Sequence, residues 1–156
     1  MSLDTVRTEM KTIIEAVSGI GKVHDYERYT HDWKKYEQLF TKADKVNTWQ
    51  IERPTFSRYV HGSQGPTAGV ERVIHDFIIR GFYALSDELA SEKTFQDIVE
   101  AVCQAFRNKP TLNDKAEMIK ISSDSPVTGR IFKDYLGAVL CHIVEISISI
   151  QEKITF

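Results

Sequence analysis

Cysteine, proline and glycine are scarce in this sequence: its 156 residues include 2 cysteines, 4 prolines and 8 glycines. Two cysteines, Cys103 and Cys141, are too few for a secreted disulfide scaffold and match no zinc-ligand spacing, so we expect free thiols in a reducing compartment. The hydrophobic share of 42% and the charged share of 27% exclude disordered, collagen-like and low-complexity chains. The chain length predicts a single soluble domain over residues 1–156.

The sequence also lacks an excess of positive charge and a long uninterrupted hydrophobic run. Its 20 basic and 22 acidic side chains give a net charge of −2, which disfavours binding to nucleic acid through phosphates. The most apolar stretch, residues 139–150, is broken by His142 and Glu145, so we expect no membrane span. The N-terminal residues have neither a basic start nor an apolar core of signal-peptide length. We therefore expect a cytosolic protein, or one assembled from the cytosol.

Hydrophobic periodicity predicts two main helices and a short one. Apolar residues recur at helical spacing from Val6 to Val17, after a cap at Ser2 or Asp4 and before Gly19. Residues 32–41 show the same spacing over a shorter span.

The second main helix is predicted from its apolar stripe, Phe95 to Phe106, with Cys103 beside the stripe. Ser91 or Thr94 is its predicted cap, residues 94–97 imitate a capping box, and Asn108 and Pro110 close it.

Strands are predicted wherever apolar and polar residues alternate. Residues 46–53 form one strand that Pro54 stops, and residues 70–85 form a longer one in which Gly81 indicates a bulge or bend. Short strands are expected near residues 23–29 and 118–121, and the last strand covers residues 137–154. The order of strands and helices predicts an α+β fold, a mostly antiparallel sheet with the two main helices packed on one face. The glycine fingerprint of a Rossmann fold and the P-loop are both missing.

Two segments are longer than a compact domain of this size needs. The predicted hairpin loop at 54–69 exceeds usual loop lengths, holds Arg58 and Tyr59 and has no acidic residue. It is either a tolerated surface loop or an arm that becomes ordered against a partner. The last strand, if fully extended, would span about 60 Å, so either it bends or its end meets another subunit.

The candidates for chemistry do not form a reaction centre in the sequence. His24-Asp25 and His31-Asp32 lack a third ligand at a fixed spacing, so we predict surface pairs and no metal site. His75 and His142 lie on apolar strand faces and are predicted to be core or interface histidines, with a pH-sensitive contact as the alternative. We expect both thiols to be buried and inert, no cofactor to be bound and no enzyme activity.

The element order resembles the tail-terminator and tail-completion proteins of long-tailed bacteriophages and prophages, the minor tail protein U-like group. The resemblance rests on the opening helix, the stretch 20–29, Trp49 with Arg53, the strand 75–85, the helix 95–106 and the final strand. It implies a non-enzymatic virion protein that forms a hexameric ring, capping the tail tube and joining it to the head. Its partners would be copies of itself, tail-tube proteins and head–tail connector proteins, in the virion or the host cytoplasm.

Within that resemblance, four residues are candidates for contact with a partner: Arg53, Arg58, Tyr59 and Arg72. The final strand is the candidate for contact between subunits. Two other classes of function stay open at this point. One is a small cytosolic α+β domain that binds a ligand or acts as an enzyme, and the other is an adaptor that binds a peptide by strand addition.

Overall fold

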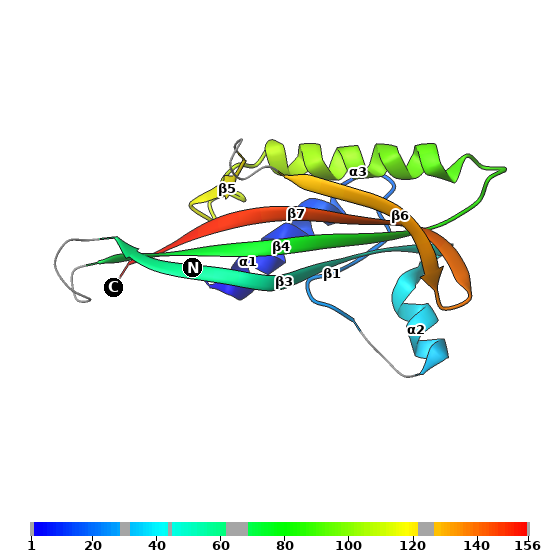
Figure 1. Cartoon of the computed structure of the whole chain (residues 1–156), viewed down its shortest axis with the longest axis horizontal. Helices are drawn as coiled ribbons and strands as arrows, with labels where there is room; N and C mark the ends of the chain where they lie inside the picture. Colours follow the sequence, from blue (N-terminus) through cyan, green and yellow to red (C-terminus); the bar gives the residue numbers. More distant parts are fainter. Residues whose placement is uncertain (1, 29–31, 44, 62–68, 122–126, 156) are drawn as a thin grey trace.

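A computed structural model describes residues 2–28, 32–43, 45–61, 69–121 and 127–155. In this part of the chain, three helices accompany a mixed sheet of seven strands, so the fold is α+β, as predicted (Figure 1). The elements, in chain order, are α1 (Leu3–Glu15), β1 (Lys22–His24), α2 (Trp33–Phe40), β2 (Thr41–Lys42), β3 (Lys45–His61), β4 (Val70–Ala84), α3 (Ser91–Arg107), β5 (Met118–Lys120), β6 (Thr128–Leu136) and β7 (Val139–Thr155).

The sheet is built around three long neighbouring strands. Its order is β1-β3-β4-β7-β5, with β2 paired to β3 and β6 paired to β7. β1 runs parallel to β3, and the other described pairs are antiparallel. β4 pairs with β7 from Val70 opposite Thr155 to Ala84 opposite Cys141, without a break in register. The predicted antiparallel character is therefore confirmed.

The two main helices cover one face of the sheet, as their periodicity predicts. Val6, Met10, Ile13 and Ile14 form the buried stripe of α1, which Ser2 caps by accepting a hydrogen bond from the Thr5 amide. The stripe of α3, from Phe95 to Phe106, is buried in the same core. These stripes pack with alternate residues of the long strands, among them Trp49, Ile51, Phe77, Ile79, Ile146, Ile148 and Ile150.

The opposite face carries α2 at one end and paired charges along the middle. Phe40 of α2 packs edge-to-face on Phe82, with ring centroids 6.1 Å apart, in a second apolar cluster. Beyond that cluster, Arg80 on β4 bonds Glu52 on β3 at 2.9 Å and Glu145 on β7 at 3.3 Å. This face therefore needs no helix above its middle, because its charges neutralise one another across neighbouring strands.

The segment predicted as a loop at 54–69 is largely strand. β3 continues to His61, and a register shift between Glu52 and Thr55 accommodates Pro54 without ending the strand. β4 begins at Val70, and residues 62–68 lie outside the described part of the chain. We call residues 53–61 of β3 with residues 70–76 of β4 the arm, because Figure 1 shows them at one end of the long axis, away from α2 and α3.

The last strand is long, as predicted, but it is not an edge strand. β7 lies between β4 on one side and β6 and β5 on the other. The strand β6, which the sequence pattern does not predict, forms a hairpin with β7 and takes up the edge at Thr128–Leu136. Alternation along β7 is confirmed: Ile146, Ile148 and Ile150 are buried, and Ser147 is exposed.

Two local predictions are wrong. The strand ladder passes through Gly81 with no bulge, and a Cβ there would lie 2.7 Å from the Trp49 ring, so this glycine makes room for the indole. α3 has no side-chain cap at either predicted residue. Its N-cap is Ala90 in a left-handed conformation (φ 48°), and Ser91 is the first helical residue.

Candidate functional site

The arm presents a row of three exposed side chains on one face of β3. Phe56, Arg58 and Val60 lie at alternate positions, so their side chains point to the same side of the strand. Phe56 is 55% exposed and Val60 is 49% exposed, and the Arg58 side chain is 55% exposed, 3.4 Å from Glu71. We call this set the arm row. Large apolar side chains exposed together around a cation are typical of an interaction surface.

A buried polar cluster holds the base of the arm. Arg53 donates to His75 Nδ1 at 3.0 Å, and His75 Nε2 lies 3.1 Å from Glu152 Oε2 on β7. The Arg53 guanidinium also stacks over the Phe56 ring, 4.7 Å from its centroid. Burial lowers the pKa of His75, and Glu152 partly opposes this effect by its hydrogen bond. The prediction that His75 is a core histidine is confirmed, because it is 2% exposed.

A second network ties the arm to the segment before β5. Arg72 makes a bidentate contact with Glu117, with N–O distances of 3.0 to 3.2 Å. Glu117 also accepts from Gln151 at 2.8 Å, and Tyr59 donates to Gln151 at 3.3 Å. Hydrogen bonds from Arg72 and Gln151 lower the pKa of Glu117. These contacts link β3, β4 and β7 to Glu117, directly before β5.

The four predicted contact residues all lie on the arm, in different settings. Arg53 and Arg72 are engaged within the chain, at His75 and Glu117. Arg58 and Tyr59 remain more accessible, and the Tyr59 side chain is 40% exposed. Arg58 and Tyr59 are therefore better placed to meet a partner, and Arg53 and Arg72 to hold the arm in shape.

The sheet has two outer edges without a neighbouring strand in the described part of the chain. β1 pairs with β3 only from Thr48 to Gln50, so β3 has a free edge from Ile51 to His61. β6 pairs with β7 alone, which leaves its other edge open from Thr128 to Leu136. The backbone groups along such edges can accept a further strand.

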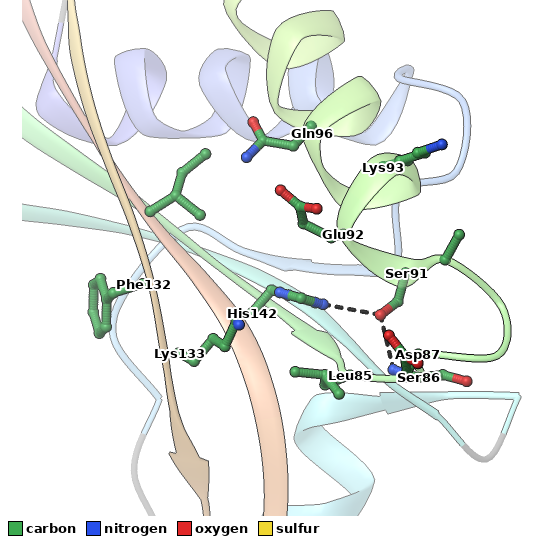
Figure 2. A pocket seen from close by; sticks show the side chains of 12 residues that line it. Leu85, Ser86, Asp87, Ser91, Glu92, Lys93, Gln96, Phe132, Lys133 and His142 are labelled. Carbon is green, nitrogen blue, oxygen red and sulfur yellow. Dashed lines mark hydrogen bonds between the residues drawn. The ribbon is translucent and has the colours of Figure 1, made fainter.

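A cleft of about 660 Å³ lies at the other end of the molecule, between the start of α3 and the hairpin of β6 with β7 (Figure 2). His142 of β7 and Ser91 of α3 meet at its floor, with His142 Nε2 2.9 Å from Ser91 Oγ. Ser91 Oγ also accepts from the Ser86 amide at 2.8 Å. Figure 2 shows Glu92 and Gln96 pointing from α3 toward β6 and β7.

The contact between Ser91 and His142 resembles half of a catalytic triad, but its surroundings favour a structural role. His142 is 3% exposed and its ring stacks on Phe95, with centroids 5.7 Å apart. Burial lowers the pKa of His142, so the ring is neutral near pH 7. Among the described residues, no carboxylate bonds to His142, and the Ser91 hydroxyl is held by Ser86. A catalytic serine needs a base oriented by a third group.

Within the described residues, His24 and the two thiols belong to no metal-binding group. His24 is half-buried and bonds to the Leu39 carbonyl oxygen at 2.9 Å, and its predicted companion His31 lies outside the described residues. Both cysteines are free, as predicted. Burial raises the pKa of Cys141 to about 11, and burial also raises that of the half-buried Cys103. Over the residues that the structure describes, no three His, Cys, Asp or Glu side chains gather as a metal site would require.

Of the three residues of the arm row, the sequence predicts Arg58 as a contact residue but not Phe56 or Val60. Phe56 and Val60 lie in the segment predicted as a loop, which belongs to β3. Their alternation with Arg58 is the signal that could have identified them. The exposed residues Asp87, Glu88 and Leu89 carry no pattern beyond that of a helix start.

Comparison with known proteins adds no family to these observations. The sequence matches no protein-family model, and no curated protein shows significant similarity to it. Within the described residues, none of the helices combines the length and the apolar character that crossing a bilayer requires.

Proposed function

We propose that this chain is a structural subunit of a bacteriophage or prophage particle, a tail terminator or head–tail joining protein that forms a ring of identical copies on the tail tube. The observation that carries the proposal is the arm. The arm lies at one end of the long axis, away from α2 and α3 (Figure 1). Phe56 and Val60 are exposed apolar side chains of the arm. The element order, which resembles that family, supports the same function.

The free strand edges support self-association. Unprotected edges on monomeric proteins are usually shortened, bulged or covered, because they otherwise recruit another chain. Here β3 is free from Ile51 to His61, and β6 is free along its outer side within the described residues. The two edges lie on different sides of the sheet, so one copy can contact two neighbours through different surfaces, as a ring requires.

The ring can be tested on the purified full-length chain by light scattering after size-exclusion chromatography, from low micromolar to several hundred micromolar. Six copies of the 17.9 kDa chain have a mass of about 107 kDa, and electron microscopy would show closed rings. A chain that stays monomeric over the whole range, with no rings in the micrographs, would contradict the proposal.

Strand addition by a peptide is a second candidate, favoured by the same free edge of β3. An adaptor of this kind would remain monomeric and would bind an extended peptide along residues 51–61. The measurement that separates the two is the oligomeric state. If the chain assembles into a ring, the adaptor is excluded. If the chain stays monomeric and the edge amides of β3 become protected from hydrogen exchange only when peptide is added, the adaptor is supported.

A further inference from the structure

The arm joins the rest of β3 at an irregular point of the sheet. The ladder between β3 and β4 is paired up to Glu52 and resumes at Thr55, so Arg53 and Pro54 have no partner in the register of these two strands. Pro54 also has no amide hydrogen to donate. Because the ladder is interrupted there, side chains have to hold the base of the arm.

The side chain that holds this point is Arg53, and its acceptor is one nitrogen of His75. Arg53 donates to His75 Nδ1 at 3.0 Å, and His75 Nε2 lies 3.1 Å from Glu152 Oε2. An arginine only donates and an ionised carboxylate only accepts, so these partners require the neutral tautomer with its proton on Nε2. His75 and Glu152 are each 2% exposed, so a hydrogen bond lost here is not readily replaced by one to water.

Protonation of His75 disturbs this arrangement at one atom. The second proton goes to Nδ1, which changes from an acceptor into a donor. The Arg53 guanidinium and the imidazolium are then two donors of like charge that face each other. The contact of Nε2 with Glu152 is kept and becomes an ion pair. The hydrogen bond to Arg53 is therefore the one that breaks.

The surroundings of the imidazole favour its neutral form. Burial is the largest cause that lowers the pKa of His75 from its ordinary value of 6.5, the cations Arg53 and Arg58 of β3 lower it further, and Glu152 of β7 opposes them. Asp76, the next residue of β4, points to the opposite face of the sheet, where it accepts hydrogen bonds from hydroxyl groups of β3 and β7. The proton on Nδ1 is thus disfavoured near neutral pH and is taken up in acid.

Arg53 also connects His75 to the arm row. Its guanidinium lies over the Phe56 ring, 4.7 Å from the centroid, and Phe56 is opposite His75 in the ladder of β3 and β4. When Arg53 leaves Nδ1, the cation that covers Phe56 moves as well. The protonation state of one buried histidine therefore acts on the first residue of the arm row.

We propose that His75 is a pH-sensitive switch for the arm. In its neutral form it binds Arg53 and holds the base of the arm against β4, and in its protonated form it releases Arg53 and loosens the arm. A partner bound by the arm row would be held less tightly in acid. The switch operates within one chain, so it goes beyond the proposed ring and does not depend on it.

Hydrogen exchange combined with an NMR titration tests the switch on the dilute full-length chain, from about pH 8 to about pH 5. As the His75 imidazole titrates, the protection factors of the amides that bond β3 to β4 between Thr55 and His61 should fall at least about tenfold more than those of α1. Arm protection that follows that of α1 while His75 titrates overturns the proposal, as does an imidazole that stays neutral until the chain unfolds.

Arg53→Met separates the switch from a purely structural role of His75. The variant keeps an apolar stem beside Phe56 but removes the donor that opposes a proton on Nδ1, so the pKa of His75 should rise by at least about half a unit and the arm should lose its additional pH dependence. Arg72→Met is the matched control, because it removes an arginine of the same arm whose partner is Glu117. It should leave both properties as in the wild type. An unchanged pKa of His75 in Arg53→Met, or the same rise in both variants, overturns the switch.

Discussion

At the scale of single residues, buried polar side chains connect the elements more specifically than the apolar core does. His142 fixes the start of α3 through Ser91, and His75 fixes the base of the arm through Arg53 and Glu152. Burial lowers the pKa of both histidines, so each favours the neutral form in the folded chain. The stability that they contribute therefore depends on pH.

Lowering the pH should destabilise the fold through these histidines. Because the folded-state pKa of His142 is below its ordinary value of about 6.5, the unfolded chain binds the proton more readily, so unfolding becomes easier as the pH falls below 6.5. We expect the variant His142→Gln to show a shallower loss of stability between pH 6.5 and the folded-state pKa. Urea unfolding at a series of pH values measures the free energy of unfolding. If this free energy falls equally with pH in the variant and the wild type, His142 does not cause the loss of stability.

The contact between Gly81 and Trp49 predicts a large effect of one methyl group. A Cβ at Gly81 would lie 2.7 Å from the indole ring of Trp49, which is fully buried, so the ring or the strand must move. We expect Gly81→Ala to lower the free energy of unfolding by about 1–3 kcal/mol. Gly129→Ala is the matched control, because nothing lies within 4 Å of its Cβ position. Equal free energies of unfolding for the two variants, measured in urea, would show that the Trp49 ring moves aside without cost.

At the scale of elements, the long strands differ in how their edges are used. β4 has β3 on one side from Val70 to Tyr83, apart from the register shift at Phe77, and β7 on the other, whereas β3 is paired only with β4 beyond Gln50. Half of the amides in that part of β3 point away from β4, where they have no described partner strand.

Hydrogen exchange can detect these free amides directly. In the dissociated chain, the outward-facing amides from Ile51 to His61 should exchange much faster than those of β4 at the same depth in the arm, since exchange of a paired amide requires opening of the ladder. Assembly should slow the exchange of these amides if a neighbouring copy covers the edge of β3. Uniform protection of both strands in the dissociated chain would contradict the free edge.

Elements with a buried face can be predicted from the sequence, and elements without one cannot. α1 and β7 follow their apolar periodicity, because each buries a continuous stripe in the core. Residues 54–61 and β6 are mostly exposed, so their strands depend on hydrogen bonds to β4 and β7 that no local pattern encodes. Pro54 and Gly129 strengthen the wrong interpretation, since both types usually interrupt strands.

The candidate site was predictable in part for the same reason. Arg58 and Tyr59 can be predicted because they lie in a long segment without acidic residues, and His75 and His142 because they interrupt apolar faces. The exposed residues 87–89 between β4 and α3 could not be found in this way. They follow the ordinary chemistry of a helix start, and only the folded chain shows that they lie at the end opposite the arm (Figure 1).

At the scale of the whole molecule, the arm lies at one end of the long axis and the start of α3 at the other (Figure 1). Ends built from different elements favour chains or rings over two-fold dimers. Assembly through such ends links stability to concentration. We expect the midpoint of thermal unfolding to rise with concentration for the wild type and for Arg107→Glu. For Arg58→Glu it should be lower and nearly constant. Differential scanning calorimetry measures the midpoint, and Arg107, an exposed residue of α3, serves as the control position. Identical concentration dependence in all three proteins would contradict a role of Arg58 in assembly.

The unbroken pairing of β4 has a mechanical consequence. β4 begins in the arm and ends beside α3, and β7 accompanies it over the whole distance. A pull on the arm along the strands meets hydrogen bonds that lie across the direction of the force. Such bonds share the load and must break together, whereas bonds at a peeled edge break one after another. Tension applied at one end of the molecule is thus carried through to the other by a single strand.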